Sequence, residues 1–179
     1  MRALKEIVTL VILAVLIVVP IRVFIAQPFV VEGLSMYPTF NDHDYLIVDE
    51  LSYHLHAPSR GDVIIFRYPG NPSIFYIKRI IGLPSETVRI DQGIVTVTKT
   101  NGEKLTLSEP YVVAEDATYS ATTTLGSDQY FVMGDNRPKS SDSRVWGPLP
   151  KDDIIGRAYL RVYPLQGAGV LPGSAALPQ

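Results

Sequence analysis

The chain has 179 residues, which is enough for one ordinary domain and an appendage. Its formal net charge is −2 and no basic run could track a phosphate backbone, so no nucleic-acid partner is expected. The sequence contains no cysteine, which excludes disulfides, thiolate metal sites and a cysteine nucleophile.

The N-terminal segment predicts a membrane anchor. No charged residue interrupts positions 7–19, and positions 7–25 reach the roughly 20 residues that crossing a bilayer requires, provided that Arg22 extends toward the headgroups. Arg2 and Lys5 precede the run, so the positive-inside rule predicts a cytoplasmic N-terminus. We therefore expect an anchor over residues 1–27 and an extracytoplasmic domain after it.

Two other interpretations of this segment stay open. A removable signal peptide carries small residues at both −1 and −3, whereas a cut after Ala26 would place Phe24 at −3. A buried core helix is the second alternative.

"GLSMYPTF", residues 33–40, places Ser35 just beyond the apolar segment. A serine hydroxyl is a poor nucleophile unless a base takes its proton, and no histidine stands beside it. His43 lies in a polar turn, where a solvated side chain is expected. His54 and His56 alternate in "SYHLHAP" and would share one face of a strand, which leaves a metal site without a clear third ligand as a minor alternative.

From Tyr45 onward the sequence predicts a mainly antiparallel β domain over residues 28–165. Short runs of β-branched and aromatic residues alternate with Gly, Pro, Asn and Asp. Asn101-Gly102 lies between two alternating runs and predicts a two-residue hairpin, within an excursion over residues 91–128 whose last part, 108–128, is irregular. Residues 166–179 are rich in Pro, Gly and Ala and predict a disordered tail. The expected strands are "YLIVDEL", "GDVIIFRY", "FYIKRIIG", "ETVRI", "GIVTVTKT", "KLTL", "YFVMGD" and "RAYLRVYP".

Lys78 is the better candidate for the base. In "IFYIKRII", strand periodicity puts Tyr76, Lys78 and Ile80 on one face. Burial among apolar neighbours and an adjacent cation both lower the pKa of a lysine, and a neutral lysine can act as general base. Periodicity alone favours an alternative in which the stem covers apolar surface while the amine reaches water.

"GDNRPKSSDSRVWGP", residues 134–148, concentrates hydroxyls, carboxylates and guanidinium groups. Asp142 and Arg144 are predicted to form an ion pair. A serine of this loop could hold the lysine amine in position, although spacing does not identify which serine does so.

The sequence resembles the bacterial type I signal peptidases, which are membrane-anchored serine–lysine endopeptidases. The resemblance covers the apolar segment and four ordered blocks: "GLSMYPTF", "RGDVIIFRYP", "YIKRIIGLPSE" and "GDNRPKSSDSRVWGP". It implies an antiparallel β catalytic domain with one N-terminal transmembrane helix, in which Ser35 is the nucleophile and Lys78 the general base. It also implies a lysine-orienting serine and three supporting charged residues, which are Ser140, Asp135, Asp142 and Arg144.

The same resemblance implies how substrate is bound. Gly33 lies two residues before the nucleophile, as in the single-span form, so the oxyanion would rely on the Ser35 backbone N–H and the region of Gly33. The implied activity is removal of N-terminal signal peptides from exported preproteins at the bacterial plasma membrane, by a monomer without metal or organic cofactor. The residues implied to line pockets for small side chains at −1 and −3 are Val31, Met36, Phe40, Tyr76 and Ile77.

Two alternative functions are carried forward. One is a processing peptidase of the same clan with narrower substrates. The other is an inactive, membrane-tethered β domain that binds peptides, which predicts the loss of Ser35, Lys78 or Ser140; all three are present.

Overall fold

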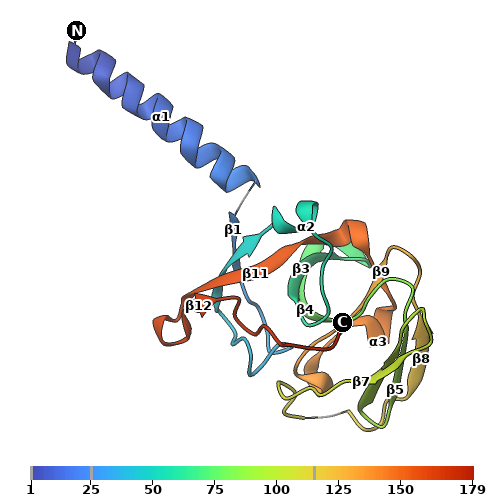
Figure 1. The fold of residues 1–179 in the computed structure, drawn as a ribbon. Coiled ribbons are helices and arrows are strands. Elements are labelled where there is room, and N and C mark those ends of the chain that lie inside the picture. The colour runs from blue at the N-terminus through green and yellow to red at the C-terminus, as the bar shows by residue number, and fades with distance from the viewer. Residues whose placement is uncertain (1, 25, 115) are drawn as a thin grey trace.

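The protein consists mainly of β-strands, which form two antiparallel sheets (Figure 1). The computed structural model describes the backbone of the whole chain except residues 1, 25 and 115, and describes side chains outside residues 1–4, 17–26 and 115. The prediction of a mainly antiparallel β fold is confirmed.

The larger sheet carries the segments around Ser35 and Lys78. Its strands lie in the order β1-β2-β11-β3-β4-β9-β10, and β12 pairs with β11. Residues 63–66 of β3 and residues 77–82 of β4 are buried at its centre, and most of them are Val, Ile or Phe. The strands are β1 (Ala26–Val30), β2 (Tyr45–Asp49), β3 (Val63–Tyr68), β4 (Asn71–Gly82), β9 (Gln129–Met133), β10 (Leu149–Pro150), β11 (Ile154–Tyr163) and β12 (Gly169–Val170).

The smaller sheet corresponds to the predicted excursion, with different bounds. It begins at β5 (Thr87–Asp91), earlier than residue 91, and continues through β6 (Ile94–Thr98) and β7 (Lys104–Thr106). β8 (Ala121–Thr124) pairs with β5 inside the segment that was predicted to be irregular. The strand order is β7-β6-β5-β8.

The hairpin between β6 and β7 is present, but its turn differs from the two-residue form predicted. The Lys99 N–H donates to the Glu103 carbonyl over 2.8 Å, and the Gly102 N–H donates to the Lys99 carbonyl over 3.0 Å. Gly102 has a φ of +85°, in the left-handed region. The loop therefore contains three residues, with glycine where the left-handed conformation is needed.

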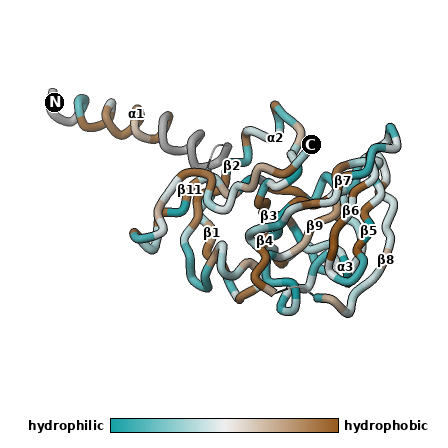
Figure 2. Tube along the Cα trace, turned by 60° about the horizontal axis from the view of Figure 1, so that its bottom comes forward, coloured by the Kyte–Doolittle hydropathy of each residue, from teal (hydrophilic) through white to brown (hydrophobic). Residues whose placement is uncertain are grey.

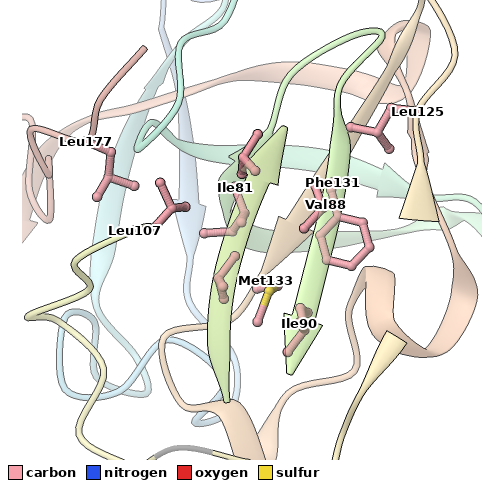
Figure 3. Close-up of a cluster of buried hydrophobic side chains, with 10 residues drawn as sticks. Ile81, Val88, Ile90, Leu107, Leu125, Phe131, Met133 and Leu177 are labelled. Carbon is pink, nitrogen blue, oxygen red and sulfur yellow. The ribbon is translucent and has the colours of Figure 1, made fainter. Parts of the chain in front are cut away.

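One cluster of buried apolar side chains joins the two sheets (Figure 3). The larger sheet contributes side chains from β4 and β9, and the smaller sheet contributes side chains from β5 and β6. This shared core fixes one sheet against the other through burial of apolar surface. Its members are Ile81, Val88, Ile90, Val95, Val97, Leu107, Leu125, Phe131, Met133 and Leu177.

The C-terminal segment differs from the predicted disordered tail. Residues 169 and 170 form β12 against β11, and Leu177 is buried in the core between the sheets (Figure 3). The Gln179 side chain accepts a hydrogen bond from the Arg60 N–H and donates one to the Arg60 carbonyl, over 3.2 and 3.0 Å. Leu177 supplies the apolar contact that a composition rich in Pro, Gly and Ala does not indicate.

Short helical segments connect the strands, and a long N-terminal helix precedes them. α1 (Arg2–Phe24) extends away from both sheets (Figure 1), and Figure 2 shows apolar residues along its described part. The short segments are α2 (Ser52–Leu55), α3 (Ser143–Trp146) and the 3₁₀ turns η1 (Arg137–Lys139), η2 (Lys151–Asp153) and η3 (Leu165–Gly167).

Over the described residues, no helix combines the length and the apolar composition that crossing a membrane requires. The predicted span over residues 7–25 includes residues 17–25, whose side chains lie outside the described part of the chain. The anchor therefore stays a prediction.

Candidate active site

Ser35 and Lys78 come together although 43 positions separate them in the sequence. Ser35 lies in the turn that follows β1, and Lys78 lies in the buried half of β4. The Lys78 Nζ donates a hydrogen bond to the Ser35 Oγ over 2.8 Å and a second to the Ile77 carbonyl over 2.9 Å. The serine hydroxyl and a candidate base are therefore in direct contact.

Burial sets the protonation of the Lys78 amine. Only 3% of the residue is exposed, and burial lowers its pKa from 10.5 to about 8, against the opposing charges of Asp142 and Asp135. The next residue along β4, Arg79, is a cation, but it is itself paired with the Asp135 carboxylate. Desolvation, and not a neighbouring positive charge, makes this amine a weaker acceptor of protons than an ordinary lysine.

The Asp135–Arg79 pair lies beside the Ser35–Lys78 contact and is fully buried. The Arg79 Nε and one terminal nitrogen donate to the two Asp135 oxygens over 2.9 and 2.6 Å, a bidentate arrangement. The Thr39 hydroxyl donates to the same carboxylate over 2.5 Å. Asp135 therefore ties the turn after Ser35 to the strand that carries Lys78.

The predicted ion pair between Asp142 and Arg144 is present. The Arg144 Nε and a terminal nitrogen donate to Asp142 over 2.8 and 2.9 Å. Asp142 also accepts from the Gly134 N–H over 3.0 Å and caps α3 by accepting from the Arg144 N–H. This pair holds together the two ends of the loop over residues 134–144.

Ser140 differs from the predicted lysine-orienting serine. Its Oγ is buried and has no hydrogen-bond partner among the described residues, so the expected contact with the Lys78 amine is not observed. The hydroxyl instead packs against Gly134, where an added Cβ would collide with both the Ser140 Oγ and the Ser35 carbonyl oxygen. Glycine at position 134 is thus what lets this loop approach Ser35.

Two further residues hold the Ser35 turn, and the sequence reasoning did not identify either. The Asn136 N–H donates to the Ser35 carbonyl and its Nδ2 donates to the Leu34 carbonyl, each over 3.0 Å. Asp42 accepts from the N–H of Gly33, which has a φ of +86°. Asn136 stands inside the block "GDNRPKSSDSR", and this position was the sequence signal that could have identified it as a residue of the site.

The Ser35 backbone N–H has no acceptor within the part of the chain that the structure describes. It remains available to a bound group at the position where the oxyanion donor was expected.

A groove of about 540 Å³ opens beside Ser35 and Lys78. Residues 29–35 form one wall and residues 73–78 form the other, with Leu46 and Ile65 also lining it. Of the residues implied to line substrate pockets, Val31, Tyr76 and Ile77 line this groove. Met36 and Phe40 do not, because both are buried in the apolar core that supports the Ser35 turn.

The three histidines take no part in this site. His54 lies in α2, so the strand that would have placed His54 and His56 on one face does not exist. His43 is exposed and its Nδ1 lies 3.0 Å from Asp42. Within the described residues, no three potential metal-ligating side chains gather into a group.

Comparisons with known proteins show which family the chain resembles. A family model described as "Signal peptidase, peptidase S26" matches residues 4–163. A probable signal peptidase I-2 from Synechocystis sp. is 38% identical, with 90% of this chain and 74% of the relative covered. Signal peptidase I T from Bacillus subtilis is 37% identical, with 86% and 82% covered. A crystal structure of a signal peptidase I from Enterococcus faecalis aligns with 57% of this chain and 97% of its own, at 34% identity and a TM-score of 0.47.

The extent of the family match, together with identities above one third over most of the chain, identifies the protein class. The chain belongs to the S26 family of signal peptidases and is a serine peptidase.

Proposed function

We propose that this protein removes N-terminal signal peptides from exported preproteins, with Ser35 as nucleophile and Lys78 as general base. The observation that carries the proposal is the 2.8 Å hydrogen bond between a buried lysine amine and a serine hydroxyl at the side of a groove. A depressed lysine pKa of about 8 leaves a usable fraction of neutral amine near neutral pH.

The reaction begins when the neutral Lys78 amine takes the proton of the Ser35 hydroxyl. The Ile77 carbonyl accepts one N–H of the amine, which leaves the lone pair of the neutral amine free to face the Ser35 hydroxyl. The Ser35 Oγ attacks the scissile carbonyl carbon, and the Ser35 N–H donates to the resulting oxyanion. The Lys78 ammonium then protonates the leaving amine, and water releases the acyl group with Lys78 again as base.

The groove favours an extended peptide with small side chains near the cut. A strand laid between the walls formed by residues 29–35 and 73–78 can bond to both backbones, as in strand addition. Alternate side chains of a strand point the same way, so the residues at −1 and −3 face the same wall. Val31 and Ile77 line the groove and would meet these side chains, so they are the residues we propose to select for small ones.

We further propose that α1 anchors the enzyme in the bacterial plasma membrane, with the N-terminus cytoplasmic and the catalytic domain outside. The described side chains of residues 5–16 are exposed, and most of them are apolar. Apolar surface of this extent is typical of contact with lipid or with a partner. Arg2 and Lys5 precede the apolar run, as the positive-inside rule requires.

The test uses detergent-solubilised full-length protein and a secretory preprotein with alanine at −1 and −3. The product mass is read for wild type, Ser35→Ala, Lys78→Ala and the control Lys104→Ala, which changes an exposed lysine of β7. We expect one cut after −1 by wild type and the control only. Cleavage by Ser35→Ala or Lys78→Ala would contradict the dyad. A preprotein that wild type binds but leaves uncut would support the peptide-binding alternative.

A further inference from the structure

A segment of the smaller sheet reaches the catalytic loop of residues 134–144. Glu109 follows β7, and its carboxylate accepts from the Arg137 guanidinium over 2.6 and 3.1 Å. The two side chains are only 5% and 2% exposed. A buried, bidentate pair of this kind fixes the direction of both side chains.

Arg137 passes this constraint to the Ser35 turn. Its Nε donates to the Gly134 carbonyl over 3.0 Å, and its own carbonyl accepts from Arg144 over 2.7 Å. The preceding residue is Asn136, which donates to the carbonyls of Leu34 and Ser35. The position of Glu109 therefore affects the backbone that holds the nucleophile.

Tyr111 makes the second contact, toward Lys78. Its hydroxyl donates to the same Glu109 carboxylate over 2.8 Å. The centroid of its ring lies 3.9 Å from the Arg79 guanidinium carbon, in a cation–π contact. Arg79 follows Lys78 in β4 and pairs with Asp135.

We propose that Glu109 and Tyr111 form a clamp through which the smaller sheet positions Ser35 and Lys78 relative to each other. Both are positioning residues, because neither lines the groove. Glu109 acts on the nucleophile through Arg137 and Asn136, and Tyr111 acts on the base through Arg79. The inference rests on the proposed dyad, and it gives the segment after β7 a function in the chemical step.

Small displacements at a reacting pair have large effects on rate. A misplacement of about 1 Å caused by a change far from the chemistry can cost about 100-fold. Glu109→Gln keeps the shape of the side chain but removes the charge that directs the Arg137 guanidinium, so the loop at residues 134–137 can shift away from Ser35. Neither Glu109 nor Tyr111 lines the groove, and the clamp reaches its wall only through the Asn136 bonds to Leu34 and Ser35, so we expect substrate affinity to change less than kcat.

The experiment measures kcat and KM of the full-length enzyme on a fluorogenic signal-peptide substrate, and Kd for the same peptide in a Ser35→Ala background. We expect Glu109→Gln to lower kcat by about tenfold or more, with KM and Kd within about threefold of wild type. Tyr111→Phe keeps the ring over Arg79 and is expected to retain more activity than Tyr111→Leu.

Two controls separate positioning from a general loss of structure. Glu103→Gln removes an exposed carboxylate of the same sheet that pairs with Lys99, and Val97→Ala opens a cavity in the shared core. Glu103→Gln should leave kcat, KM and Tm unchanged, and Val97→Ala should lower Tm with little change in kcat.

Two results would overturn the clamp. One is a Glu109→Gln enzyme whose kcat lies within twofold of the wild-type value, when the wild-type enzyme cleaves the peptide. The other is a Glu109→Gln enzyme that, like Val97→Ala, loses kcat, affinity and Tm in parallel. A wild-type enzyme that leaves the peptide uncut would overturn the proposed function, and the clamp with it.

Discussion

At the residue scale, the proposed chemistry of the site depends on the burial of a single amine. Lys78 occupies the half of β4 in which every residue is buried, while its Nζ remains within 2.8 Å of the Ser35 hydroxyl. An exposed lysine at the same distance would stay protonated near pH 7 and could not accept the serine proton. Asp135 and Asp142 oppose the shift, so their pairing with Arg79 and Arg144 helps to keep the amine weakly basic.

The pH dependence of cleavage follows from this pKa. Only the neutral amine can take the Ser35 proton, and the pKa of Lys78 is lowered to about 8. We therefore expect kcat/KM to rise about tenfold per pH unit below about pH 8 and to level off above it. Rates measured from about pH 6 to about pH 10 on a peptide without ionisable side chains test this. A profile that stays flat across that range would exclude Lys78 as the base.

At the element scale, strands were predictable and long-range contacts were not. Runs such as "VIIF" and "FYIKRII" carry their own β signal, so β3 and the buried half of β4 appear where expected, although β4 begins earlier, at Asn71. The predicted loop length at Asn101-Gly102 was too short by one residue, because Asn101 does not adopt the positive φ that a two-residue turn needs. β8 was missed because a strand of Ala and Thr has no apolar alternation and depends on pairing with β5.

The same distinction applies to the site. The contact between Ser35 and Lys78 depends on how β4 packs beside the Ser35 turn, which no local pattern encodes, so only the resemblance to a family brought the two together. The Asp142–Arg144 pair was predictable because the two residues are neighbours on one turn. The clamp was missed because Glu109 and Tyr111 lie in a segment without periodicity, and the residues that connect them to the site, Arg137 and Arg79, are 28 or more positions away.

The C-terminal segment provides a test at this scale. Leu177 is 7% exposed and packs in the core between the sheets, whereas Val170 of β12 is 62% exposed. We expect Leu177→Ala to lower the free energy of unfolding by about 2–3 kcal/mol, because it leaves a cavity. Val170→Ala should change it by less than about 0.5 kcal/mol. Denaturant unfolding of both variants measures this, and equal effects would mean that the segment is not packed as described.

At the scale of the whole molecule, the sheets form one body and α1 stands apart from it. The shared apolar core, the Arg60–Glu86 pair and the Arg137–Glu109 pair all lie where the smaller sheet meets the larger one. Buried ion pairs are weak evidence for stability, but their fixed geometry favours one orientation of the two sheets. This is the orientation in which the clamp reaches the catalytic loop.

α1 makes its main contacts with β1 and otherwise projects into the surroundings (Figure 1). A chain that begins at Ala26 keeps every residue of β1, which pairs with β2 along its whole length. We therefore expect this truncated chain to fold and to cleave a short peptide with kcat/KM within about threefold of the full-length enzyme, because Ser35, Lys78, the groove and the clamp lie outside α1.

The truncated chain should lose most of its binding to lipid vesicles, measured by flotation, and with it the processing of preproteins held at those vesicles. Undiminished flotation of the truncated chain would contradict α1 as the anchor, and loss of the near-UV circular dichroism signal would show that the β domain needs α1 to fold.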